Sequence, residues 1–123
     1  MIYFLQILRP VNLFIIAVCV VLSALIVNKS PINIIPIMLV IILLAGFANI
    51  INDIIDYKID QANKLNRPIA LGKLSINAAV IYALILFAST LFVLFYYSFN
   101  LITLKLILCI NIPSIILYTP FLK

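Results

Sequence analysis

Long apolar runs alternate with short polar stretches along this 123-residue chain. Two short polar turns separate the first pair of runs and the last pair, whereas a longer polar connection over residues 53–75 joins the second run to the third. Each run approaches the ~20 residues that a helix needs to cross a hydrocarbon core. The pattern predicts an all-α, multi-pass transmembrane helix bundle with helices over residues 10–27, 34–52, 76–97 and 101–119. The fourth helix is interrupted by Lys105, Asn111 and Pro113.

The composition supports a lipid environment. Apolar residues make up 67% of the chain and charged residues 9%, against roughly 25% charged residues in ordinary soluble domains. Cys19 and Cys109 lie inside apolar runs without CxxC spacing and are expected to act as small hydrophobes. The chain contains no His, which argues against zinc and haem sites. No basic face interleaved with aromatic residues is present, so no nucleic-acid partner is expected.

The distribution of Lys and Arg predicts how the helices are oriented. Cytoplasmic segments of membrane proteins carry an excess of these residues. An N-terminus in the cytoplasm places only Lys29 and Lys105 on the opposite side. The same topology places six basic residues on the cytoplasmic side, together with the polar connection: Arg9, Lys58, Lys64, Arg67, Lys73 and Lys123.

All acidic residues of the chain fall within one octapeptide, as Asp53, Asp56 and Asp60. If the second helix continues past Ile51 at ~100° per residue, these carboxylates share one face with Asn49 and Asn52, within an arc of about 100°. At ~1.5 Å per residue, Asp53 lies near the inner edge of the hydrocarbon. Ionisable groups at that depth are expected to be functional.

Three neighbouring carboxylates repel each other unless a cation lies between them. Mg²⁺ is typically held by one or two carboxylates plus substrate phosphates, and Lys58, Lys64, Arg67 and Lys73 follow close by. Carboxylates, a metal ion and basic side chains together suit a diphosphate leaving group. The simpler alternative is a solvated helix end whose acidic side chains pair locally with Lys and Arg.

Four segments of the chain contain short motifs with a recognisable pattern. Residues 52–60, Asn-Asp-Ile-Ile-Asp-Tyr-Lys-Ile-Asp, resemble the NDxxDxxxD motif of the UbiA-type intramembrane prenyltransferases. Residues 66–75 resemble the NRPxxxG loop of that family, with Ala70-Leu71 where Pro-Ser is more usual. Residues 8–12, Leu-Arg-Pro-Val-Asn, resemble the RPxN opening of the first helix. Tyr118 and Lys123 resemble a closing Tyr…Lys signature, at a spacing of five residues instead of the more common four.

The resemblance implies a nine-helix fold that holds a prenyl diphosphate and Mg²⁺ between two aspartate motifs, with a lipophilic acceptor as the second substrate. It implies catalytic or metal-binding roles for Asp56 and Asp60, with Asn52 as a ligand of metal and diphosphate and Asp53 as a further metal ligand. Arg67 and Lys123 would contact phosphate, and Tyr118 would stabilise the allylic cation or orient the Lys. Asn49 and Asn12 would support the site. An interfacial anchoring role for Tyr118 is equally compatible with the sequence.

Within the family, the acidic motif and the Asn-Lys-x-Asn-Arg-Pro run resemble those of geranylgeranylglycerol-phosphate geranylgeranyltransferases, which make ether lipids. Quinone, haem and chlorophyll prenyltransferases share the core motif and remain alternatives, as does a small oligomeric cation-binding or transport protein. No acidic residue follows Asp60, so a second aspartate motif is missing. We therefore expect residues 1–123 to form the N-terminal part of a prenyltransferase domain that is inactive by itself.

Overall fold

The computed structural model describes residues 2–28, 30, 34–97, 99–111 and 113. Within these residues the chain is helical and contains no strand, which confirms the prediction of an all-α fold for this part. The elements follow one another as α1 (Ile2–Ile7), α2 (Pro10–Ile26), α3 (Ile35–Ala62), α4 (Ile76–Tyr96), α5 (Leu101–Leu106) and the π-helical turn η2 (Ile107–Asn111).

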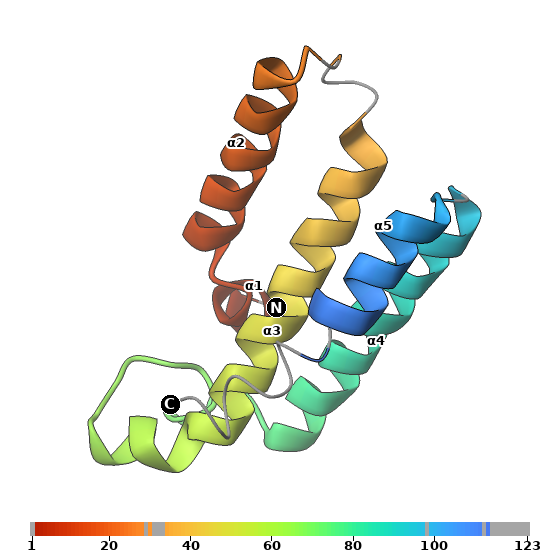
Figure 1. Cartoon of the computed structure of the whole chain (residues 1–123). Helices are drawn as coiled ribbons and strands as arrows, with labels where there is room; N and C mark the ends of the chain where they lie inside the picture. Colours follow the sequence, from red (N-terminus) through yellow and green to blue (C-terminus); the bar gives the residue numbers. More distant parts are fainter. Residues whose placement is uncertain (1, 29, 31–33, 98, 112, 114–123) are drawn as a thin grey trace.

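The long helices α3 and α4 lie side by side and form the centre of the structure (Figure 1). Two clusters of buried apolar side chains join them. One cluster lies toward the connection between α3 and α4 and combines the following residues: Ile7, Phe47, Ile50, Ile69, Leu74, Ala79 and Ala83. The other joins the opposite halves of α3 and α4 to η2 and contains Val40, Leu44, Val93, Leu94 and Ile107.

Side-chain hydrogen bonds cap the N-termini of α4 and α5. Oγ of Ser75 accepts a hydrogen bond from the backbone N–H of Ala78 at 3.2 Å, at the start of α4. Oδ1 of Asn100 accepts from the backbone N–H of Thr103 at 2.8 Å, at the start of α5. Each side chain satisfies one of the backbone donors that a helix N-terminus leaves unpaired.

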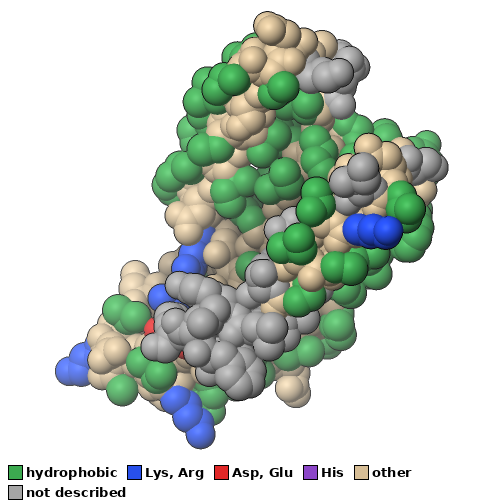
Figure 2. Space-filling model, viewed as in Figure 1, with side chains coloured by type: hydrophobic (Ala, Val, Ile, Leu, Met, Phe, Trp, Pro, Cys, Tyr) green, Lys and Arg blue, Asp and Glu red, His purple; other side chains and the backbone are tan. Residues whose placement is uncertain are grey.

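The apolar surface agrees with a bilayer environment. Helices α3 and α4 are long and apolar enough to cross a membrane, and the apolar helix α2 has 17 residues. Only Ala24 is fully buried on α2. Figure 2 shows hydrophobic side chains over the outside of the helices, with most of the visible Lys and Arg near the end of α3. The predicted fourth span, 101–119, extends beyond the residues that the structure describes.

The polar connection is shorter than the sequence predicts. Helix α3 continues to Ala62, so the acidic residues lie on its last three turns instead of in a loop over residues 53–75. No residue before Asn63 breaks the helical pattern, and the chain turns at Lys64, whose φ is 52°. The connection therefore comprises residues 63–75. The acidic side chains lie on a continuous helix, as the prediction of a shared face requires.

A second difference is α1, which the sequence analysis does not predict. Pro10 lacks a backbone N–H and disfavours the α conformation at Arg9. Arg9 instead adopts a left-handed conformation, with φ 55° and ψ 69°, and ends the short helix before α2 begins. Gly46 of α3 lies close to the residue that follows α1, because a Cβ there would lie 3.0 Å from Cδ2 of Leu8.

Candidate metal and diphosphate site

The carboxylates of α3 are buried. Asp53, Asp56 and Asp60 are only 2%, 6% and 4% exposed. Burial of ionised carboxylates is unfavourable unless they are paired and hydrogen-bonded. The arrangement therefore differs from the solvated helix end considered above, although Asp53 and Asp60 do pair with arginine side chains.

Arg67 links two of these carboxylates. Its Nη1 lies 3.2 Å from Oδ1 of Asp53 and 2.6 Å from Oδ2 of Asp60. Two residues of the following loop, Ile69 and Leu74, are buried in the apolar cluster beside α3. The loop is thus fixed to the helix that carries the acidic residues, and Arg67 is held over them.

The turn after Arg67 needs a glycine. The N–H of Leu71 donates to the carbonyl of Arg67 at 2.9 Å, and the N–H of Gly72 donates to that of Ile69 at 2.9 Å. Gly72 has φ 68°, in the left-handed region that side chains with a Cβ rarely adopt. The conformation explains why a Gly stands at this point of the Arg-Pro loop.

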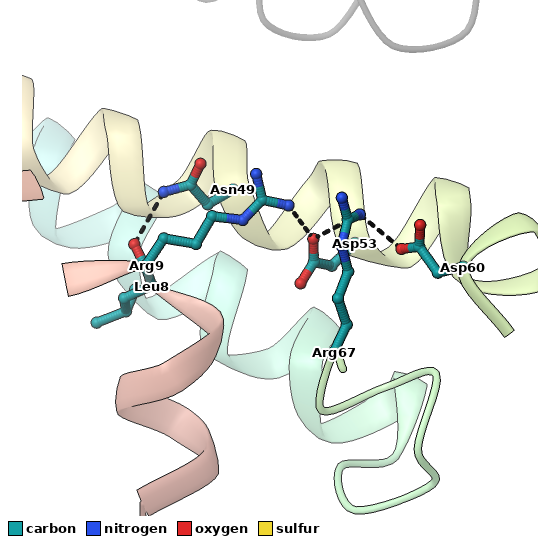
Figure 3. A network of polar contacts seen from close by, with 6 residues as sticks. All are labelled: Leu8, Arg9, Asn49, Asp53, Asp60 and Arg67. Atoms are coloured by element: carbon teal, nitrogen blue, oxygen red, sulfur yellow. Dashed lines mark hydrogen bonds and ion pairs between the residues drawn. The ribbon is translucent and has the colours of Figure 1, made fainter. Parts of the chain in front are cut away.

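A second arginine reaches Asp53 from the break between α1 and α2. Nη2 of Arg9 lies 2.5 Å from Oδ1 of Asp53, the same oxygen that Arg67 approaches. Figure 3 shows the two guanidinium groups on either side of this carboxylate, with Arg9 toward Asn49 and Arg67 toward Asp60. Positive and negative groups therefore alternate along the last turns of α3.

The other predicted residues take different places. Asn49 donates from Nδ2 to the carbonyl of Leu8 at 2.8 Å, and so fixes the end of α1 to α3. Asn52 is half-buried on α3. The side chain of Asn12 is exposed on α2, and its backbone N–H donates to the carbonyl of Arg9 at 2.9 Å. Tyr118 and Lys123 lie outside the described residues.

The donor set agrees with a magnesium site that substrate phosphates complete. In the described part of the chain, no group of three or more His, Cys, Asp or Glu side chains is arranged to hold a metal ion. However, Asp53 and Asp60 direct one oxygen each toward a common cationic nitrogen, Nη1 of Arg67. Because Mg²⁺ commonly takes one or two carboxylates together with phosphates, two converging carboxylates fit such a site. The four-residue ligand set of Asn52, Asp53, Asp56 and Asp60 stays a prediction.

Arg9 is a residue of the RPxN motif to which the sequence analysis assigns no role in the site. Its contact with Asp53 spans 44 positions of sequence, so helical periodicity on α3 cannot reveal it. One signal was available in the sequence. A charged residue directly before a helix-starting proline in an apolar chain needs a partner, and the acidic residues occur at only one place.

Comparison with known proteins identifies the family. The sequence model of the UbiA prenyltransferase family matches residues 12–123. The chain is 38% identical to the digeranylgeranylglyceryl phosphate synthase of Methanothermobacter thermautotrophicus over 85 residues, which cover 69% of this chain and 30% of the relative. The enzyme of the same name from Methanosphaera stadtmanae is 40% identical over 84 residues, 68% of this chain and 31% of the relative.

The chain is also 32% identical to the digeranylgeranylglyceryl phosphate synthase of Methanococcus aeolicus, over a longer stretch of 120 residues. It covers 94% of this chain and 41% of that relative. The chain thus spans about a third of the length of the curated relatives that it matches. No solved structure matches significantly. The family match and the apolar helices identify an integral membrane protein, and the chain belongs to the UbiA prenyltransferase family.

Proposed function

We propose that this chain provides the first aspartate motif of a Mg²⁺-dependent prenyltransferase that transfers a prenyl group from a prenyl diphosphate to a lipophilic acceptor. Geranylgeranylglyceryl phosphate, an ether-lipid precursor, is the proposed acceptor. The observation that carries the proposal is that the carboxylates of Asp53 and Asp60, at the end of an apolar helix, both contact the guanidinium of Arg67. The names of the relatives support a phosphate-bearing glycerol lipid as the product.

The proposed reaction exchanges one C–O bond for another. The bond between the allylic carbon and the diphosphate breaks, and the diphosphate leaves with the electron pair. The acceptor hydroxyl oxygen then bonds to the allylic carbon and loses its proton, which gives an ether. A bound Mg²⁺ would neutralise charge that develops on the leaving diphosphate. Arg67 contributes a planar guanidinium that matches phosphate oxygens. Asp53 and Asp60 would hold the metal ion.

The remaining residues of the motifs have proposed roles as well. Tyr118 would stabilise the allylic cation or orient Lys123, and Lys123 would contact phosphate. Asn52 and Asp56 complete the proposed metal and diphosphate ligands on α3. These assignments follow the motifs that the chain shares with its family.

The proposed orientation places the acidic end of α3 at the cytoplasmic face of the membrane. Water-soluble Mg²⁺ and diphosphate are available there, while the isoprenoid chain extends into the apolar part of the bundle. The excess of Lys and Arg on this side supports this orientation. Cysteine substitutions at exposed Lys64 and Lys105, labelled with a membrane-impermeant thiol reagent in sealed cells, test it, because only the second should react from outside.

We further propose that residues 1–123 are inactive without the remaining length of the relatives. A single aspartate motif offers one side of a metal-diphosphate site. The matched regions cover only 30% and 41% of the length of these relatives. Purified 123-residue chain that transferred a prenyl group in a Mg²⁺-dependent reaction would contradict this proposal.

The function is tested with the full-length protein that contains this chain, in detergent micelles. Labelled geranylgeranyl diphosphate is supplied with geranylgeranylglyceryl phosphate or with an aromatic quinone precursor, each with Mg²⁺ or EDTA. The proposal predicts an ether product from the first acceptor, in Mg²⁺ only. Asp56→Asn should abolish turnover, while Lys105→Gln, a change at an exposed position of α5, should not. Prenylation of the aromatic acceptor alone would reject the lipid acceptor, and equal effects of both substitutions would reject the site.

A further inference from the structure

Two guanidinium groups approach the same carboxylate oxygen of Asp53. Its Oδ1 lies 2.5 Å from Nη2 of Arg9 and 3.2 Å from Nη1 of Arg67. Arg67 also contacts Asp60, so each of these two carboxylates keeps a guanidinium partner even without Arg9. Arg9 balances the second negative charge of the pair in this structure, a charge that the proposed Mg²⁺ would balance in the loaded site.

The backbone places Arg9 in an unusual conformation that aims its side chain at this site. Arg9 has φ 55°, a left-handed conformation that costs about 1–2 kcal/mol for a residue with a Cβ. The hydrogen bond from Asn49 to the carbonyl of Leu8 holds the preceding residue against α3. The guanidinium approaches Asp53 from the side of Asn49, away from the connection that carries Arg67 (Figure 3).

The exposure of the two partners differs. The side chain of Asp53 is 2% exposed, whereas that of Arg9 is 32% exposed. A guanidinium carries five N–H donors, and an accessible one can donate to a ligand. Arg67 would remain beside Asp53 if Arg9 turned toward such a ligand, so the buried carboxylate would keep a cationic partner.

We propose that Arg9 binds the phosphate of the acceptor lipid, while Arg67 serves the diphosphate of the donor. This inference rests on the proposed function, in which both substrates are anionic. A phosphate monoester carries about two negative charges at neutral pH and three acceptor oxygens, so it competes well with one carboxylate for a planar guanidinium. Arg9 thereby selects an acceptor that bears a phosphate.

The spacing of the two arginines suits this assignment. Both guanidinium groups meet at one oxygen of Asp53, so phosphates bound to them lie near each other. The short glycerol backbone of the acceptor keeps its hydroxyl a few bonds from its phosphate. The hydroxyl would therefore stand close to the allylic carbon, which is attached directly to the donor diphosphate. Such positioning of two reactants is a major source of rate enhancement.

The test compares two acceptors in the same full-length protein: geranylgeranylglyceryl phosphate and its dephosphorylated alcohol, geranylgeranylglycerol. The measured quantity is the ratio of kcat/KM for the two acceptors, which does not depend on how much of a variant is folded. Arg9→Gln should lower this ratio about 10- to 100-fold, the loss of a charged hydrogen bond. Arg9→Lys should give an intermediate ratio, because it retains the charge and loses the planar fork.

A binding measurement provides a second readout. The Kd of geranylgeranylglyceryl phosphate without donor, measured by isothermal titration calorimetry, should rise in Arg9→Gln by a similar factor. The KM for geranylgeranyl diphosphate should change by less than about 3-fold, within the scatter of a neutral substitution. Lys105→Gln, which removes an exposed charge from α5, should change neither quantity.

Each other outcome has a defined meaning. An unchanged ratio in Arg9→Gln, an equal loss on both acceptors, or equal use of both acceptors by the unmodified protein would overturn the role of Arg9. The last result would leave prenyl transfer itself intact. Failure of the unmodified protein to form product from either acceptor would instead reject the proposed function.

Discussion

The arrangement of the two arginines predicts how the acidic residues differ in their effect on stability. Asp53→Asn removes the charge of a carboxylate that is 2% exposed and accepts hydrogen bonds from Arg9 and Arg67. Asn has nearly the same shape, so the substitution changes charge and hydrogen bonding with little change in packing. Arg67 retains its contact with Asp60 at 2.6 Å, whereas Arg9 loses its described carboxylate partner.

The magnitude follows from the burial of each partner. Removing one member of a fully buried ion pair costs about 3–5 kcal/mol. The side chain of Arg9 is 32% exposed and that of Arg67 26%, so solvent compensates part of the lost interaction. We expect Asp53→Asn to lower the free energy of unfolding by about 2 kcal/mol. Asp60→Asn should lower it by only about 1 kcal/mol, because it removes one hydrogen bond and leaves Arg67 paired with Asp53.

The assay is equilibrium unfolding of the full-length protein in mixed micelles, followed by circular dichroism, with EDTA present to remove metal ions. Lys58→Gln is the matched control for loss of an exposed charge on α3 and should change the free energy of unfolding by less than about 0.5 kcal/mol. In a double-mutant cycle, Arg9→Gln and Asp53→Asn should couple by about 1–2 kcal/mol. A stabilising effect of Asp53→Asn would refute the reasoning, because repulsion among the acidic residues would then outweigh their pairing with arginine. An effect no larger than that of Asp60→Asn would also refute it.

Three further substitutions test separate parts of the structure. Arg67→Gln should raise the KM for prenyl diphosphate about 10- to 100-fold in initial-rate assays, because a guanidinium–phosphate contact is lost; an unchanged KM would contradict its assignment. Asn49→Ala should lower the free energy of unfolding by about 1–2 kcal/mol, because the carbonyl of Leu8 loses its donor, and a neutral result would mean that this bond does not hold α1 in place. Gly72→Ala should lower the free energy of unfolding by about 1 kcal/mol, because φ is 68° although a Cβ would meet no atom within 4 Å. Gly72→Asn should lower it by less, because Asn tolerates this conformation better. Equal losses of stability would argue against a conformational origin.

Local patterns in the sequence predict the helices and the acidic face well. The predicted first and third spans, 10–27 and 76–97, lie close to α2 (Pro10–Ile26) and α4 (Ile76–Tyr96). Helical periodicity alone places Asp53 and Asp60 on one face, because residues seven positions apart are separated by two turns of the same helix. In the structure, one guanidinium nitrogen contacts both side chains.

Tertiary contacts account for what the sequence does not predict. Arg9 and Asp53 are 44 positions apart, and their pairing depends on the break after α1 lying against α3, where Asn49 binds the carbonyl of Leu8. Asn49 lies on the predicted polar arc, but its amide group binds the carbonyl of Leu8. A six-residue helix such as α1 is too short to produce a clear periodic signal, and its formation depends on the packing of Ile7 into the core.

The central claim is that the acidic face of α3 binds a prenyl diphosphate together with Mg²⁺. Equilibrium binding of a non-ionising thiolo analogue of geranylgeranyl diphosphate to the full-length protein tests it most directly. The account predicts binding that requires Mg²⁺, is lost in Asp60→Asn and persists in Lys105→Gln. Equal affinity in Mg²⁺ and in EDTA, or full Mg²⁺-dependent binding by Asp60→Asn, would contradict it.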